Sequence, residues 1–253
     1  MSNKLTMFGR LYRRDMERIG VESLGLAGVA LITILLGLTP WNKNVIILPL
    51  VVVTGVAMVL PIITSLLSLH REWKENTIYL LLSLPVGGSS VLGAKLLAAL
   101  TQVVINASIV LIMIVACGFE LLPKQGIDWT TFWQQVQAFW QYADMSRMLP
   151  FIIIMGILLM IYGLSSLQLG VLIGKLFRRF TSVATIGALI AVFWVGSNLL
   201  NAMLSLIPAH INWSPGAAPI PTIGLVLPVA FMAIMIGLIF CGSVYVYNHR
   251  IEV

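Results

Sequence analysis

The stretch from residue 88 to residue 96 comes closest to a nucleotide-binding motif in this chain. It reads Gly88-Ser-Ser-Val-Leu-Gly93 and continues as Ala94-Lys95-Leu96. A phosphate-binding loop of the G-x-x-x-x-G-K-[ST] type needs lysine directly after the second glycine and then a hydroxyl that holds magnesium. Neither residue stands in its place, so we expect no nucleotide chemistry on this chain.

Cysteine and histidine offer no metal chemistry either. Cys117 and Cys241 fall near opposite ends of the membrane on the interpretation below, and their spacing matches no metal site. His210 lies alone in a proline-rich segment, residues 208–221, and is interpreted as a surface residue. We expect no catalytic residue, no metal and no cofactor on this chain.

Six long apolar stretches must instead organise the fold. A helix needs about 20 apolar residues to cross the hydrocarbon of a bilayer. The composition agrees, with 59% hydrophobic residues, 9% charged residues and a mean hydropathy of +1.01. We predict a single all-α transmembrane domain, a polytopic membrane protein whose six transmembrane helices are Val21–Leu38, Val45–Leu69, Leu92–Cys117, Met148–Gly174, Thr181–Ile207 and Thr222–Tyr247.

Basic residues predict the orientation of these spans. With the N-terminus inside, 12 of the 15 Lys and Arg residues fall in cytoplasmic segments, and only Lys43, Lys124 and Arg147 fall outside. The positive-inside rule then places both termini on the cytoplasmic side of a cell membrane. We expect the cell to be bacterial. The same bias explains the net charge of +6 without nucleic acid.

The middle of each apolar stretch lacks acidic and basic residues. Ion-coupled pumps and carriers usually keep ionisable groups at membrane depth. A carrier driven by an ion gradient is therefore the least favoured class of transporter.

Residues 1–20 have the pattern of an amphipathic helix. Leu5, Phe8, Tyr12, Met16 and Ile19 recur every three or four residues, and basic residues occupy the opposite face. We predict a helix lying in the inner interface. It serves either as a juxtamembrane anchor or as a moving elbow that transmits force.

Residues 70–91, between the second and third spans, form a charged connecting segment. Arg71–Leu84 has four charges in its first five residues, followed by an apolar flank, and Pro85-Val-Gly-Gly88 then turns the chain back to the membrane. We predict a short helix at the cytoplasmic surface. By itself this segment is either ordinary interface structure or a docking device.

This segment resembles one found in the permease subunits of the ABC type-2 transporter family. The shared pattern is E-x-x-x-x-T-x-x-x-L-L-x-x-P, followed about ten residues later by G-x-K. Asn76 stands where the family more often has glycine. The matching positions are Glu72, Thr77, Leu81, Leu82, Pro85, Gly93 and Lys95.

The resemblance implies a membrane subunit of an ATP-driven exporter. Two such subunits, identical or paralogous, would pair, and ATP and magnesium would bind a separate ATPase subunit. The residues that would contact the ATPase are Glu72, Lys74, Glu75 and Thr77. Members mostly export drugs, peptides, antibiotics, lipids or polysaccharides. The alternative class is a membrane scaffold or assembly factor that moves no solute.

The outer segment, residues 118–147, carries aromatic residues at roughly helical spacing. Trp129, Trp133 and Trp140 alternate with glutamines. Aromatic rings with polar edges settle at the membrane surface. The segment is either a helix on the outer leaflet or a recognition surface for an amphiphilic ligand.

Within the spans, small and amide residues mark helix contacts. Ser166, Gly170 and Gly174 lie four residues apart and predict a close approach of another helix. Asn198 and Asn201 share one face of the fifth span, where they either pack between helices or line a substrate path. Pro61 and Pro228 are expected to kink their helices, with neighbouring helices and hydroxyls compensating.

Overall fold

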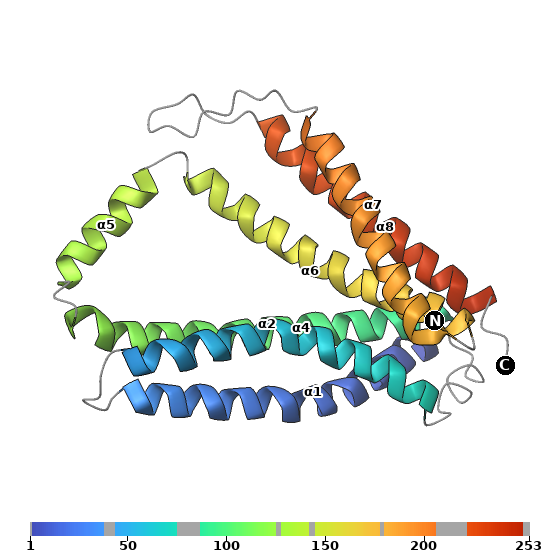
Figure 1. The fold of residues 1–253 in the computed structure, drawn as a ribbon, viewed down its shortest axis with the longest axis horizontal. Helices are drawn as coiled ribbons and strands as arrows, with labels where there is room; N and C mark the ends of the chain where they lie inside the picture. Colours follow the sequence, from blue (N-terminus) through green and yellow to red (C-terminus); the bar gives the residue numbers. More distant parts are fainter. Residues whose placement is uncertain are drawn as a thin grey trace. The chain divides into compact units, whose positions relative to one another are not determined.

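The computed structural model of the chain describes residues 2–37, 44–74, 87–124, 128–141, 145–177, 180–205 and 222–249. These residues are almost entirely helical and contain no strand, which confirms the all-α prediction. Figure 1 shows the seven described helices. They are α1 (Ser2–Gly37), α2 (Asn44–Lys74), α4 (Gly88–Lys124), α5 (Trp129–Gln141), α6 (Met145–Leu176), α7 (Thr181–Ser205) and α8 (Thr222–His249).

Six of these helices are long and apolar enough to cross a membrane, which confirms the predicted number of spans. Their outward faces stay apolar; Val21 and Leu24 on α1, for example, are each 74% exposed. In water such faces would be costly, whereas lipid covers them without penalty. The candidate spans are Thr6–Gly37, Ile47–Arg71, Gly88–Gly118, Leu149–Leu176, Thr181–Ala202 and Leu225–His249.

Helix α1 differs from the prediction. The sequence suggested a separate interfacial helix ending near residue 20, but α1 runs unbroken from Ser2 to Gly37. Its candidate span of 32 residues would be about 48 Å long, more than the roughly 30 Å of hydrocarbon. The helix does not stop at Gly20, because glycine weakens a helix without ending it, and α1 contains no proline that would break it.

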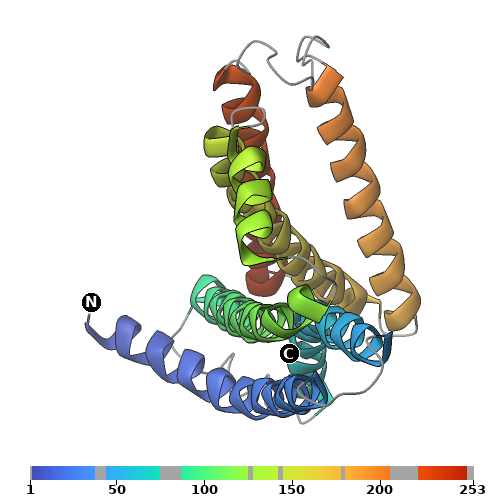
Figure 2. The ribbon, with the colours of Figure 1, turned by 90° about the vertical axis from the view of Figure 1, so that its left-hand side faces the viewer.

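The chain divides into two compact units, of which the first comprises Met1–Phe132. In this unit α4 packs against both α1 and α2. Figures 1 and 2 show the three helices side by side. Their shared core holds Leu26, Ala30, Val53, Ala57, Met113 and Cys117.

A proline in α2 shapes this first unit. Pro61 has no N–H, so the carbonyl of Ala57 loses its usual partner within the helix. The side-chain amide of Asn106, on α4, donates to that carbonyl at 3.3 Å. Asn106 in turn accepts a hydrogen bond at 3.1 Å from Ser23 on α1. A neighbouring helix therefore compensates for the proline, as predicted, and the amide ties all three helices together.

The second unit, Trp133–Val253, is organised around α6, which packs against α7 and α8. Its core cluster contains Tyr162, Met232 and Ile239. The Tyr162 hydroxyl donates to the carbonyl of Val192 on α7 at 2.9 Å. This bond fixes the height at which α7 meets α6.

Glycines on α6 confirm the predicted close approach of another helix. A Cβ on Gly170 would lie 2.8 Å from Leu189, and a Cβ on Gly174 would collide with the side chain of Thr185. Both neighbours belong to α7. Hydrogen at these positions is what allows the two backbones to come together.

Candidate functional site

The residues expected to contact an ATPase lie where the description of the chain stops. Helix α2 continues past its candidate span and ends at Lys74, and α4 begins at Gly88. Glu72 and Lys74 are in the last turn of α2, with side chains outside the described part, and Glu75 and Thr77 lie outside the described residues altogether. The short helix predicted there is therefore not tested.

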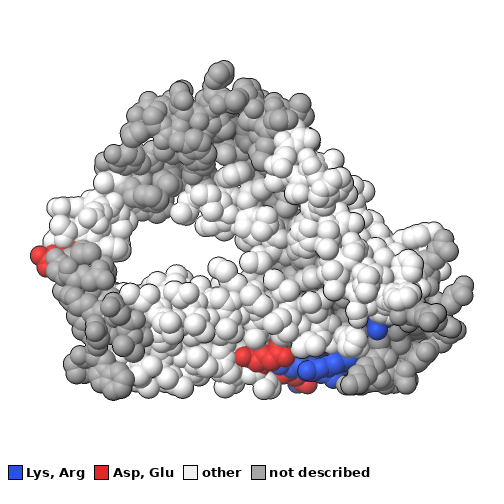
Figure 3. All heavy atoms as spheres, viewed as in Figure 1, with Lys and Arg blue, Asp and Glu red and all other residues white. Residues whose placement is uncertain are grey.

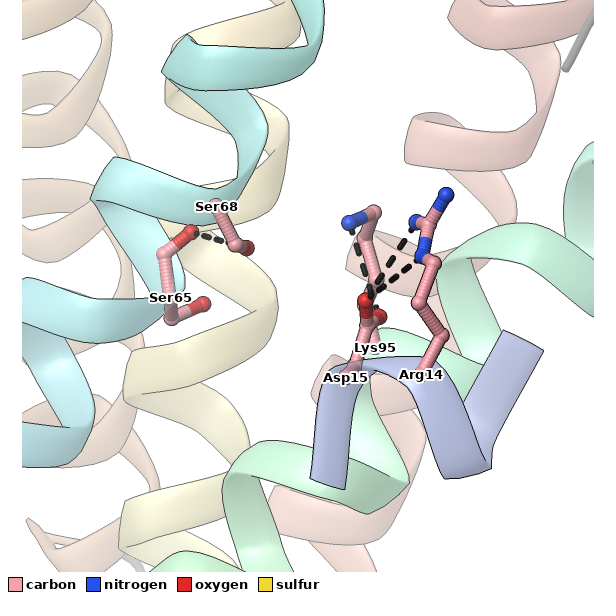
Figure 4. Close-up of polar contacts among 5 residues, drawn as sticks. All are labelled: Arg14, Asp15, Ser65, Ser68 and Lys95. Carbon is pink, nitrogen blue, oxygen red and sulfur yellow. Dashed lines mark hydrogen bonds and ion pairs between the residues drawn. The ribbon is translucent and has the colours of Figure 1, made fainter. Parts of the chain in front are cut away.

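The described residues next to this segment form a polar cluster that joins α1 to α4. The ammonium of Lys95 lies 3.6 Å from Oδ2 of Asp15. Arg14 approaches the other carboxylate oxygen, with Nη2 at 3.3 Å and Nε at 3.4 Å. Figure 4 shows both cations directed at Asp15, with Ser65 and Ser68 on the neighbouring helix α2.

Burial makes the pair between Asp15 and Lys95 unusual. Their side chains are only 10% and 5% exposed, whereas Arg14 is 40% exposed. A charge removed from water in this way is costly unless an opposite charge lies beside it. Each partner therefore holds the other in place, and α1 is fixed to the beginning of α4.

A second group of hydrogen-bonded side chains begins at Glu22, about two helical turns after Asp15 on α1. Gln102, fully buried on α4, donates to Oε2 of Glu22 at 3.4 Å. The hydroxyl of Thr64 on α2 donates to Oε1 of Gln102 at 2.6 Å. Further toward the N-terminus, the hydroxyls of Tyr12 and Thr101 lie 3.0 Å apart. The predicted apolar face of residues 1–20 thus lies against α4.

Asp15, Glu22, Thr64 and Lys95 line a small open hollow of the first unit, with a cavity volume of about 40 Å³. Its wall includes Asp15, Arg18, Glu22, Arg71 and Lys95, together with serines of α2 and apolar residues of all three helices. Figure 3 shows acidic and basic side chains gathered beside α1, on a face that is otherwise almost free of them. The hollow is the main concentration of charge in the described part of the chain.

The sequence interpretation did not identify this cluster. It placed Lys95 in the near-match to a phosphate-binding loop and in the G-x-K pattern, and it assigned Asp15 no role. A signal was present, because Asp15, Ile19 and Glu22 follow Tyr12 at helical spacing and so share the face that we took to be apolar. A carboxylate repeating on an apolar face indicates a polar partner on the helix that covers it.

Two amides of the second unit were candidates for a substrate path. Asn198 and Asn201 both lie exposed on α7. The amide of Asn198 donates to the carbonyl of Trp194 at 2.7 Å, within its own helix.

The outer aromatic segment forms a helix, α5. The carbonyl of Asp128 accepts its first backbone hydrogen bond, from Phe132 at 2.9 Å. Trp129 meets Phe132 edge to face with ring centroids 5.6 Å apart, and Trp133 is 57% exposed. The side chain of Trp140 lies outside the described part. An exposed aromatic helix fits either interpretation of this segment, the leaflet surface or a ligand surface.

Among the described residues, no three His, Cys, Asp or Glu side chains gather as a metal site would require. Fold and site together define an all-α, multi-pass membrane protein with six candidate spans. Comparisons with protein-family models, with curated proteins and with solved structures give no match.

Proposed function

We propose that this chain is the permease subunit of an ATP-binding cassette exporter. The observation that carries the proposal is the segment at the end of α2, where Arg71 closes the candidate span and Glu72, Lys74 and Glu75 follow it directly. Charges at that position need water or a protein surface, and their spacing resembles that of permeases docking on an ATPase. The failed phosphate-binding loop assigns ATP hydrolysis to a separate chain.

The geometry around the hollow supports a route for force in such a subunit. The docking segment joins the end of α2 to the beginning of α4, where Gly88 is the first helical residue. Seven residues further on, Lys95 is held to Asp15 of α1. A movement imposed on the segment by an ATPase is passed through this ion pair to α1.

The proposal includes an arrangement in the membrane. Both termini face the cytoplasm of a bacterial cell, two permease subunits pair as a homodimer or a paralogous heterodimer, and each binds one ATPase. The substrate is a drug, peptide, antibiotic or lipid-like molecule. Asn198 and Asn201, exposed on α7, are available to a substrate path between paired subunits.

Orientation is tested by labelling single cysteines in intact cells. In a background with Cys117→Ser and Cys241→Ser, we expect an impermeant thiol reagent to label Gln125→Cys and to spare Asn3→Cys and Val253→Cys. The reason is the concentration of basic residues in the segments that this orientation places inside. Labelling of the two ends with none at position 125 would show that the chain is inverted.

Docking is tested by reversing the two acidic charges of the segment. Glu72→Lys with Glu75→Lys replaces attraction to basic or amide groups of an ATPase with repulsion. Breaking a desolvated charge pair at an interface costs about 2–5 kcal/mol, and a charge at the rim costs much less. We expect the variant to insert and fold, but to co-purify with less ATPase or to lose coupling between ATP hydrolysis and transport.

The matched control places the same charges on the outer helix. Gln134 and Gln137 are exposed on α5, so Gln134→Lys with Gln137→Lys should spare ATPase binding. If the inner variant keeps both wild-type ATPase binding and coupled transport, the docking assignment is wrong. The scaffold alternative, in which no solute moves, is then preferred.

A further inference from the structure

The charges around the hollow in the first unit are not balanced. Three cations, Arg18, Arg71 and Lys95, and two carboxylates, Asp15 and Glu22, line it. Both carboxylates are already engaged by the protein. Lys95 and Arg14 approach Asp15, and the amide of Gln102 donates to Glu22. The acidic side of the hollow therefore has little capacity left for a ligand.

The two arginines of the hollow, in contrast to its carboxylates, are not engaged by other side chains of the described part of the chain. Arg18 on α1 and Arg71 on α2 are exposed, and neither has an ion pair or side-chain hydrogen bond within the described part of the chain. A guanidinium offers five donors in a planar fork that matches the oxygens of a phosphate. Two such groups on one hollow create a site for an anion with several oxygens.

The position of the hollow relative to the membrane spans indicates the source of that anion. The candidate span of α2 ends at Arg71. The candidate span of α1, Thr6–Gly37, is longer than the hydrocarbon is thick, and only its residues 23–37 are free of charge, beginning just over one turn after Arg18. Both guanidinium groups thus lie at the edge of the hydrocarbon, where lipid phosphates are. Ile19, Leu67, Ala98 and Ala99 give the same hollow an apolar wall, against which an acyl chain can lie.

We infer that this hollow binds the phosphate headgroup of an anionic phospholipid, with Arg18 and Arg71 as its ligands. The site ties a lipid of the adjacent leaflet to α1 and α2 beside the pair between Asp15 and Lys95. The excess of positive charge selects an anionic headgroup over a zwitterionic one. The inference concerns this chain alone and does not depend on an ATPase.

The test uses the full chain, purified in detergent and stripped of lipid, and counts bound lipids by native mass spectrometry. Phosphatidylglycerol and phosphatidylcholine with identical acyl chains are the two probes. We expect phosphatidylglycerol to bind at least about tenfold more tightly, because each arginine–phosphate contact is a charge-assisted pair. Equal affinity for the two lipids would overturn the inference.

Variants locate the site. Arg18→Gln with Arg71→Gln should weaken phosphatidylglycerol binding at least about tenfold. Arg10→Gln with Arg13→Gln removes the same charge from exposed positions of α1 outside the hollow and should change the affinity by less than about threefold. Equal losses in the two variants would mean diffuse attraction and no site.

Two further arms guard against misfolding and against a soluble ligand. Arg18→Lys with Arg71→Lys keeps the charge without the planar fork, and its affinity should fall between those of wild type and the glutamine variant. If it binds as the glutamine variant does, the charge excess plays no part and the inference fails. Glycerol phosphate at millimolar concentration should not displace the lipid; displacement would assign the site to a soluble phosphate.

Discussion

Asp15→Asn is expected to destabilise the first unit more than any other single change in its polar cluster. The substitution leaves the Lys95 ammonium, whose side chain is only 5% exposed, without its carboxylate. Removing one partner of a buried ion pair costs about 3–5 kcal/mol. Lys95→Met should cost less, because Arg14 remains beside Asp15 and is partly in water.

The double variant separates an ion pair from ordinary packing. Asp15→Asn with Lys95→Met removes both charges and leaves a neutral amide against an apolar side chain. Replacing both partners of a buried pair is often nearly neutral. We therefore expect the double variant to be more stable than Asp15→Asn alone, although it carries one more substitution.

A natural thiol reports on the stability of this unit. Cys117 is buried in the core between α1, α2 and α4, while Cys241 is exposed on α8. In a Cys241→Ser background, a thiol-reactive dye labels Cys117 only when that core opens. The temperature at which half of Cys117 is labelled therefore ranks the variants by the stability of the first unit. A double variant that is as unstable as the sum of its single variants would show that the two charges do not interact.

The sequence predicted what depends on local composition. Span number, helical class and the close approach at Gly170 and Gly174 follow from apolar length and from residue size at a spacing of four. Each of these signals lies within one helix, so no knowledge of its neighbours is needed. Compensation for Pro61 by a neighbouring helix was predicted, but not that the side-chain amide of Asn106 would supply it.

The polar cluster could not be predicted in the same way, because its partners are far apart in the chain. Asp15 and Lys95 lie 80 residues apart in the sequence, and so do Glu22 and Gln102. Only the pairing of α1 with α4 brings them together. In the sequence Lys95 lies near the start of an apolar stretch and reads as a headgroup-level lysine, whereas its side chain is buried beside Asp15.

The N-terminal boundary was wrong for a related reason. Basic residues opposite an apolar face describe an interfacial helix when lipid covers that face. In this chain α4 covers it, through Tyr12 and Thr101 and the charged pair below them. The same periodicity then belongs to a helix that continues into the membrane span.

Gly174→Val is expected to disrupt the second unit at the contact between α6 and α7. A Cβ at position 174 collides with Thr185 and lies 2.9 Å from the carbonyl oxygen of Thr181. Only residues 177–180 connect the two helices, so the first turns of α7 are tethered close to the end of α6 and cannot move away from position 174. Overpacking of this kind costs about 1–3 kcal/mol. Heating in detergent, followed by size-exclusion chromatography, should give a lower midpoint than for wild type.

Gly156→Val supplies the matched control, because it makes the same substitution in the same helix with no atom within 4 Å of the added Cβ. Loss of glycine flexibility and gain of a branched side chain are therefore equal in the two variants. Thr185→Ala should relieve part of the Gly174→Val defect by removing the colliding hydroxyl, and leave the part due to the Thr181 backbone. A Gly156→Val midpoint as low as that of Gly174→Val would show that helix propensity, and not contact with α7, sets the requirement for glycine.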